Sequence, residues 1–239
     1  EVQGDGWQGA MTYSNFTKPV WRWFYNKNAK GDPGFMMWDG NYQGSGVDLV
    51  TSYNQFIAGF PWHVRLHNMN PLDTHDIPRF KSFAIKGAQK VAAAMQFTFP
   101  GIPVIWAGDE FGLDGFNGEK SRTPLPWKNE RKHDTSMLPI YQQLTKLRRE
   151  NSALNEGSMR FIYSSAEAIV YVREDKKQTI VVCVTRGADS KISLPKDAVP
   201  GLAKAENIYG GGKIVANGSN LSLPGERLSV NVWRLRATK

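Results

Sequence analysis

A histidine and an aspartate stand side by side at positions 75 and 76, within the segment formed by residues 72–80. We interpret the preceding residues, 65–70, as a short buried strand, and Pro78 follows two positions after the aspartate. A polar pair at the carboxyl end of such a strand faces the open mouth of a parallel barrel, where barrel enzymes place their chemistry. The alternative for His75 is a hydrogen-bonded core histidine, which its Asp and Pro neighbours make the weaker interpretation.

Other chemically capable side chains follow a second apolar run. Residues 102–106 are continuously apolar, as expected of a parallel strand that is covered on both faces, and Asp109 and Glu110 come directly after it. These two acids are open to interpretation as a carboxylate pair, as metal ligands, or as groups that fix the loop and contact a ligand; we favour the last. Arg79 and Arg122 either bind substrate or pair with acids, and ion pairing is favoured. No histidine shows metal-ligand spacing, so neither a metal nor a cofactor is expected.

Composition limits the functional classes. The chain has 239 residues, enough for one large domain or two smaller ones, and a net charge of +8. The Lys and Arg residues are scattered, so we favour a solvated surface over a nucleic-acid site. No apolar run is long enough to cross a membrane. The single cysteine, Cys183, excludes an internal disulfide and suits a reducing compartment, so we expect a cytoplasmic protein.

The first two thirds of the chain alternate between expected strands and expected helices. This alternation is typical of β/α units that build a parallel sheet. Strands are predicted at residues 10–14, 64–70 and 102–106, and helices at residues 16–25, 47–60, 81–99 and 137–151.

From Gly157 onward the pattern changes to short alternating or β-branched runs separated by turn residues. This pattern predicts an antiparallel β-sandwich. The runs cover residues 160–163, 169–173, 179–185, 191–194, 205–209, 212–216, 220–223 and 228–235.

Several segments, in order, resemble the second half of the α-amylase superfamily, glycoside hydrolase family 13. Residues 72–80 resemble the motif at the end of the family's seventh barrel strand, with Thr74 where asparagine is usual. The other similar segments are residues 9–16 (sixth strand), 100–103 and 108–112 (eighth strand and its loop), 121–127, and 144–151 with the lead into the last domain. Each motif is short, but together they span nearly the whole chain.

The resemblance implies an α/β fold: the C-terminal part of a (β/α)8 TIM barrel at residues 1–156, then an antiparallel β-sandwich at residues 157–239. It assigns Asp76 the stabilisation of the transition state, and His75 the binding of a sugar hydroxyl beside the scissile bond. Arg79 and Asp109 are the further candidates for substrate binding.

The family's other two catalytic carboxylates have no counterpart in the chain. Retaining members need a nucleophilic Asp and a general-acid Glu on either side of the scissile bond. Glu1 is rejected as the acid, because it lies twelve positions before Tyr13, whereas the family spacing is about twenty. A neighbouring α-ammonium group would also favour its ionised form. We therefore expect an N-terminal fragment of the same enzyme, carrying both carboxylates, as a partner.

Two kinds of function remain in competition. The first is a fragment of a retaining hydrolase or transglycosylase that acts on an α-glucan or α-glucoside. The alternative is a non-catalytic relative that binds carbohydrate or another protein. The His75–Asp76 pair favours the enzyme, because a purely binding or structural protein has no need for that pair at the catalytic end of a strand.

Overall fold

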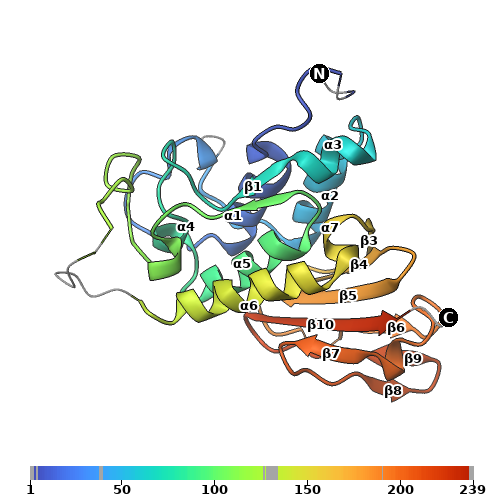
Figure 1. Ribbon diagram of the computed structural model, residues 1–239. Coiled ribbons are helices and arrows are strands. Elements are labelled where there is room, and N and C mark those ends of the chain that lie inside the picture. The colour runs from blue at the N-terminus through green and yellow to red at the C-terminus, as the bar shows by residue number, and fades with distance from the viewer. Residues whose placement is uncertain are drawn as a thin grey trace.

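The computed structural model describes residues 3, 5–37, 40–125, 127, 134–189 and 191–236, and Glu1 lies outside them (Figure 1). Two helices, α5 (Ala88–Thr98) and α6 (Met137–Glu150), run through the middle of the view. The N-terminal elements lie on one side of them, and strands β5 (Gln178–Thr185) and β10 (Ser229–Arg236) lie on the other.

A small parallel sheet lies among the N-terminal elements. Strand β1 (Met69–Pro71) pairs in parallel with β2 (Ile102–Val104), and Met11 forms an isolated parallel bridge to Met69 on the other side. The strand predicted at residues 102–106 is therefore confirmed in shortened form. The strand predicted at residues 10–14 is reduced to the single bridge, because a π-helical turn begins at Tyr13.

The strand predicted at residues 64–70 is wrong over most of its length. Residues Trp62–His67 form helix α3, and only Met69 and Asn70 of the predicted range belong to a strand. Pro61 stands at the start of this helix, where its missing N–H costs nothing. Local hydrogen bonds hold the turns, since the His67 ring contacts the carbonyl of His63 at 2.7 Å. The apolar pattern of residues 64–70 is too short to favour a strand over these local helical contacts.

The predicted helices are present with altered ends. One is interrupted: residues Phe80–Phe83 form the short helix α4, and α5 begins only after Gly87, whose φ of +88° breaks the helix. The remaining helices are α1 (Lys18–Phe24), α2 (Gly46–Ile57) and α7 (Ser152–Asn155).

Helix α2 begins with a reciprocal capping box. The Ser45 hydroxyl accepts a hydrogen bond from the Asp48 N–H at 3.0 Å, and the Asp48 carboxylate accepts one from the Ser45 N–H at 2.8 Å. We expect Ser45→Ala to lower the free energy of unfolding by about 1 kcal/mol. Urea denaturation of the complete polypeptide measures this. Thr51→Ala, on the exposed side of the same helix, is the control and should have no such cost; equal losses in the two variants would contradict the cap.

Two antiparallel sheets form the C-terminal part, and all eight predicted runs contain strands. Five strands lie in the order β3-β4-β5-β10-β7, and three in the order β6-β9-β8. The strands not yet bounded are β3 (Ser158–Ser164), β4 (Ala168–Glu174), β6 (Ser193–Pro195), β7 (Glu206–Tyr209), β8 (Val215–Asn217) and β9 (Asn220–Ser222).

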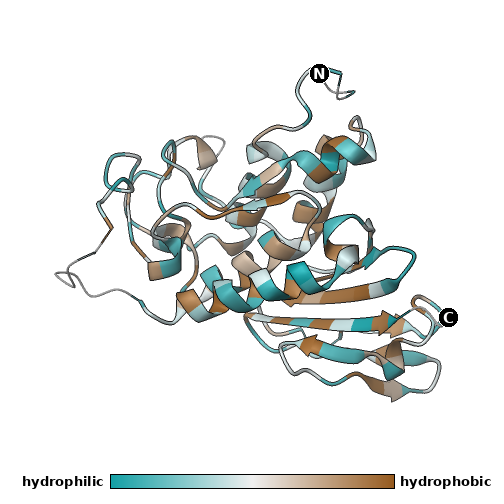
Figure 2. Cartoon of the chain, in the orientation of Figure 1, coloured by the Kyte–Doolittle hydropathy of each residue, from teal (hydrophilic) through white to brown (hydrophobic). Residues whose placement is uncertain are grey.

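The larger sheet is buried on both faces. On one face, alternate residues such as Tyr171 and Val182 join the hydrophobic cluster that contains the helices. On the other face, residues such as Val170 and Val181 pack with Leu221 of the smaller sheet. Figure 2 shows β5 hydrophobic along most of its length, as this double burial requires, whereas β10 alternates between hydrophobic and hydrophilic residues.

A buried arginine also joins the sheet to the helices. Arg173 on β4 donates to the carbonyl oxygens of Thr98, Gly157 and Ser158 at 2.7 to 3.1 Å, and burial lowers its pKa to about 9. The same hydrophobic cluster also contains residues from both sides of residue 157. The division into parts 1–156 and 157–239 stays a prediction.

Candidate active site

The His75–Asp76 pair lies in the turn that follows β1, at the carboxyl end of the parallel sheet. The Nε2 atom of His75 is 3.3 Å from Oδ1 of Asp76. Both side chains are open to solvent, at 68% and 52% exposure respectively. An exposed carboxylate and imidazole at this end of a parallel sheet are placed where a ligand can reach them.

The turn holds Asp76 through Thr74 and Tyr13. The Asp76 N–H donates to the Thr74 hydroxyl at 3.2 Å, and this hydroxyl lies 2.7 Å from the Tyr13 phenol. The same phenol donates to Oδ2 of Asp76 at 3.5 Å. Partial burial raises the pKa of Tyr13, and the charge of Asp76 adds to this effect, so the phenol stays protonated as a donor. The threonine that departs from the family pattern is thus part of the support of the candidate carboxylate.

We expect Tyr13→Phe to lower kcat in the complete polypeptide by roughly fivefold, because one hydrogen bond that positions Asp76 is lost, at about 1 kcal/mol. Steady-state kinetics on a short α-glucan measures the change. The control is Tyr42→Phe, whose ring lies against Arg22 rather than the turn. An unchanged kcat with Tyr13→Phe would contradict the positioning role.

Trp106 and Arg122 flank the pair. The ring centroids of His75 and Trp106 are 5.8 Å apart, and Arg122 Nε donates to the His75 carbonyl at 2.9 Å. Arg122 also lies 3.3 Å from Glu119. Its ion pairing, the interpretation favoured from sequence, is therefore confirmed, and its contact with the His75 backbone shapes the turn.

Arg79 and Asp109 form a buried ion pair beneath the turn. Their closest atoms are 2.9 Å apart, and the two side chains are 1% and 3% exposed. Arg79 also donates to the carbonyls of Ser121 and Ala107. Substrate contact by Arg79 and Asp109 stays a prediction, and their burial favours a supporting role, because neither side chain reaches the surface that exposes His75.

Asp73 belongs to the same buried group, and sequence reasoning missed it. Its Oδ2 atom accepts a hydrogen bond from the Phe80 N–H at 2.7 Å, so it closes the turn that carries Asp76. Its pKa is also affected by the neighbouring Asp109 carboxyl. Asp73 lies seven positions before Phe80 and outside the capping positions of α4, so no local sequence signal identifies this role.

Burial raises the pKa of Asp109 well above its usual range, and the charge of Asp73 raises it further. Burial likewise raises the pKa of Asp73, against the opposing effect of Asp109 and Arg79. Two carboxyls facing one arginine therefore retain a proton in the folded state that the unfolded chain has already lost. Because the folded pKa is the higher one, this pair stabilises the fold at low pH, and that contribution falls as pH rises through the raised pKa.

We expect Asp73→Asn to flatten this dependence, because the amide cannot ionise and so the buried pair no longer gains a second negative charge as pH rises. Between about pH 4 and about pH 8, the variant should lose at least about 1 kcal/mol less stability than the parent. Thermal unfolding of both proteins across this range measures the difference. Asp175→Asn is a control at a carboxyl whose pKa is lowered, and parallel curves for Asp73→Asn and its parent would contradict the shared proton.

Glu110 fixes the loop rather than facing the pair, since its Oε2 atom accepts a hydrogen bond from the Gly108 N–H at 2.7 Å. This agrees with the loop-fixing role favoured from sequence. Within the described parts of the chain, no three His, Cys, Asp or Glu side chains are grouped to hold a metal ion. No helix among the described residues has the length and hydropathy needed to span a bilayer.

No protein-family model matches the chain. A cyclomaltodextrinase from a Bacillus species is 32% identical over 186 residues, which cover 76% of this chain and 30% of that protein. A maltogenic alpha-amylase from Bacillus acidopullulyticus is 26% identical over 184 residues, covering 74% of this chain and 31% of the relative. The chain therefore matches less than a third of the length of these two curated relatives.

A solved structure shares the fold. The debranching enzyme of Nostoc punctiforme superposes with a TM-score of 0.79 at 21% identity, over 96% of this chain and 48% of that one. This likeness concerns the fold alone. The sequence relatives, a cyclomaltodextrinase and a maltogenic alpha-amylase among them, show that the chain belongs to the α-amylase family, glycoside hydrolase family 13.

Proposed function

We propose that the chain is part of a retaining hydrolase or transglycosylase that acts on an α-glucan or α-glucoside. The observation that carries the proposal is the exposed His75–Asp76 pair at the carboxyl end of β1, held by Tyr13 and Thr74. The names of the relatives support the substrate class, since cyclomaltodextrinases and maltogenic amylases are among them.

In this proposal the Asp76 carboxylate does its work in the transition state. Glycosidic bond cleavage passes through an oxocarbenium-like sugar, whose positive charge and altered ring shape strengthen its interaction with a nearby carboxylate. Interactions that are stronger in the transition state than in the ground state raise kcat. His75, held 3.3 Å from that carboxylate, binds a neighbouring sugar hydroxyl and fixes the ring against it.

The nucleophile and the general acid belong, in the proposal, to a preceding N-terminal half of the same enzyme. Residues 1–156 are then the C-terminal portion of a (β/α)8 barrel, and residues 157–239 are the β-sandwich after it. Strand β2 supports this arrangement: among the described strands it pairs with β1 alone, and Ile102 and Ile105 are 46% and 38% exposed. Unpaired apolar edges of this kind need a covering strand.

Part of the missing N-terminal half would pack into a cavity next to that edge. It has a volume of about 870 Å³, and Ile105, Leu138 and Tyr141 contribute to its lining. Leu138, an apolar residue on α6, is 39% exposed. A helix and strand of the N-terminal half would bury these side chains and complete the barrel. The buried cysteine, Cys183, is consistent with the cytoplasm as the place of action.

Product analysis of the complete polypeptide tests the activity. It should release shorter sugars from maltooligosaccharides or cyclic glucans, and the first product seen by NMR should be the α-anomer, as retention requires. Transfer to a second sugar would appear as longer products. No cleavage of any α-glucan or α-glucoside, including trehalose, would contradict the proposal.

Size-exclusion chromatography tests the companion separately. Residues 1–239 in isolation should aggregate, because the edge of β2 is open. When the N-terminal half is present, the two should elute together. A soluble monomer that unfolds in one cooperative transition would contradict the need for an N-terminal half.

A further inference from the structure

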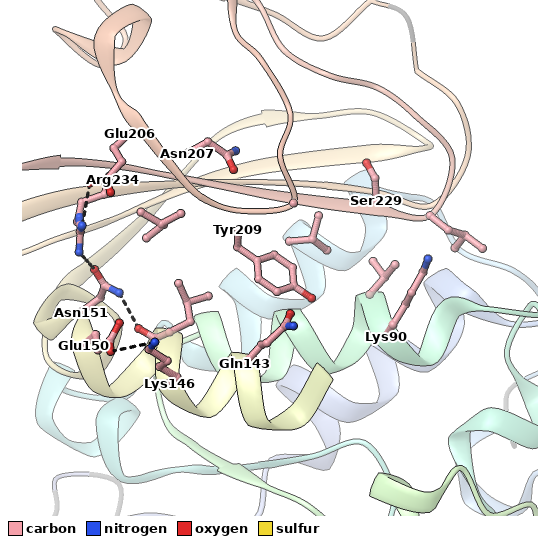
Figure 3. Close-up of a pocket in the computed structure, with 16 residues that line it drawn as sticks. Lys90, Gln143, Lys146, Glu150, Asn151, Glu206, Asn207, Tyr209, Ser229 and Arg234 are labelled. Carbon is pink, nitrogen blue, oxygen red and sulfur yellow. Dashed lines mark hydrogen bonds and ion pairs between the residues drawn. The ribbon is translucent and has the colours of Figure 1, made fainter. Parts of the chain in front are cut away.

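A groove separates the central helices from the C-terminal sheet, away from the candidate active site. Its volume is about 800 Å³, within the range of small-molecule sites, and its walls come from α5 and α6 on one side and from β7 and β10 on the other (Figure 3). None of the residues that line it belongs to the turn at residues 72–80.

Three side chains that line this groove have uncommitted polar groups, one from the sheet and two from the helices. They are Tyr209 on β7, Gln143 on α6 and Lys90 on α5 (Figure 3). Within the described chain, none of the three makes a side-chain hydrogen bond or ion pair. The Tyr209 ring packs partly against the hydrophobic cluster, so its position is fixed before any ligand arrives. Burial raises the pKa of Tyr209, so its phenol remains a neutral donor.

The charges at the other end of the groove are already paired. Lys146 lies 3.9 Å from Glu150, and Arg234 lies 2.7 Å from Glu206. Only Lys90 among the lining charges has no partner in the described structure. This balance suits a neutral ligand rich in hydroxyl groups better than a multiply charged anion, which would compete with the two glutamates.

We propose that this groove is a second, non-catalytic carbohydrate site that holds a segment of an α-glucan. The Tyr209 ring stacks on the apolar C–H face of one glucose unit, because an aromatic face buries area at low entropic cost. The Gln143 amide supplies a donor and an acceptor to adjacent hydroxyls, and Lys90 supplies a donor. The choice of an α-glucan rests on the proposed function; the polyhydroxyl character rests on the groove itself. Binding here tethers a long glucan to the enzyme while another part of it is cleaved.

Adsorption of the complete enzyme to insoluble starch in the cold, where turnover is slow, tests the site. Tyr209→Ala should weaken adsorption by roughly tenfold, and Gln143→Ala by about threefold. Cleavage of a short chromogenic maltoside should stay unchanged in both variants. The matched controls are Gln55→Ala on the exposed side of α2 and Val215→Ala on β8, and both should adsorb like the parent. Thermal unfolding checks that the variants are folded. If Tyr209→Ala does not fold, Gln143→Ala still tests the site.

The outcomes separate this inference from the proposed function. Adsorption by the parent that neither groove variant weakens would overturn the second site, as would equal losses in the controls. A parent that cleaves the maltoside but does not adsorb would also overturn it. Adsorption that depends on Tyr209 and Gln143 without any cleavage would support the site and overturn the enzyme. Binding of inorganic phosphate that depends on Lys90, with no glucan adsorption, would show an anion site instead.

Discussion

Replacing Asp76 with asparagine in the complete polypeptide is expected to lower kcat by about a thousandfold while leaving glucan binding and folding intact. The amide has the same shape but no negative charge, so it loses the attraction that grows as the sugar becomes positively charged. Removing one preorganised electrostatic group from a transition state costs roughly 10²–10³ in kcat. The side chain is 52% exposed, so the substitution leaves no buried group unpaired.

Steady-state kinetics and equilibrium binding of a maltooligosaccharide measure the two quantities separately. Asp114→Asn is the matched control, because Asp114 is exposed and lies outside the turn. If Asp76→Asn kept the activity of its parent within about threefold, Asp76 would not be the transition-state carboxylate. Binding without turnover in the parent itself would favour the alternative of a non-catalytic carbohydrate-binding relative.

The largest expected loss of stability follows from Arg79→Met. This substitution keeps an unbranched side chain, although a shorter one, and removes the only cation that contacts the buried Asp109 in the described structure. It also leaves the carbonyls of Ala107 and Ser121 without their donor. Breaking a buried ion pair from one side costs about 3–5 kcal/mol, since an uncompensated charge remains.

Urea unfolding of the complete polypeptide measures this loss, and Arg227→Met is the control at an exposed arginine. The cost should shrink at acidic pH, where Asp109 and Asp73 are both protonated and no longer need the cation. A loss below about 1 kcal/mol for Arg79→Met would mean that the pair contributes little to the fold.

Much of the secondary structure followed from the sequence. The central C-terminal strands β4 and β5 could be predicted because their β-branched runs are buried on both faces, as Val170 and Tyr171 are. Helix α3 could not, because its six residues carry no periodic signal and depend on local hydrogen bonds. Phe56, an apolar residue within the helix predicted at residues 47–60, is 53% exposed, since hydropathy alone does not specify which face meets the neighbouring helix.

The candidate site was predicted in part. His75 and Asp76 were identified from their motif, and the structure places both side chains in solvent at the expected end of β1. Tyr13 and Asp73 were not identified as supports, because each reaches the turn through tertiary contacts that sequence spacing does not encode. Tyr13 lies 61 positions before its partner Thr74, and Asp73 lies 36 positions before Asp109.

The reach of Arg173 has an evolutionary consequence. This arginine, on a strand of the terminal sheet, binds the carbonyl of Thr98, just before the chain turns into β2. If recombination exchanged the terminal sheet between relatives, the incoming sheet would need an arginine at the matching position. Without it, the carbonyl of Thr98 would lose its hydrogen-bond donor. The two regions are expected to evolve as a linked pair rather than as interchangeable modules.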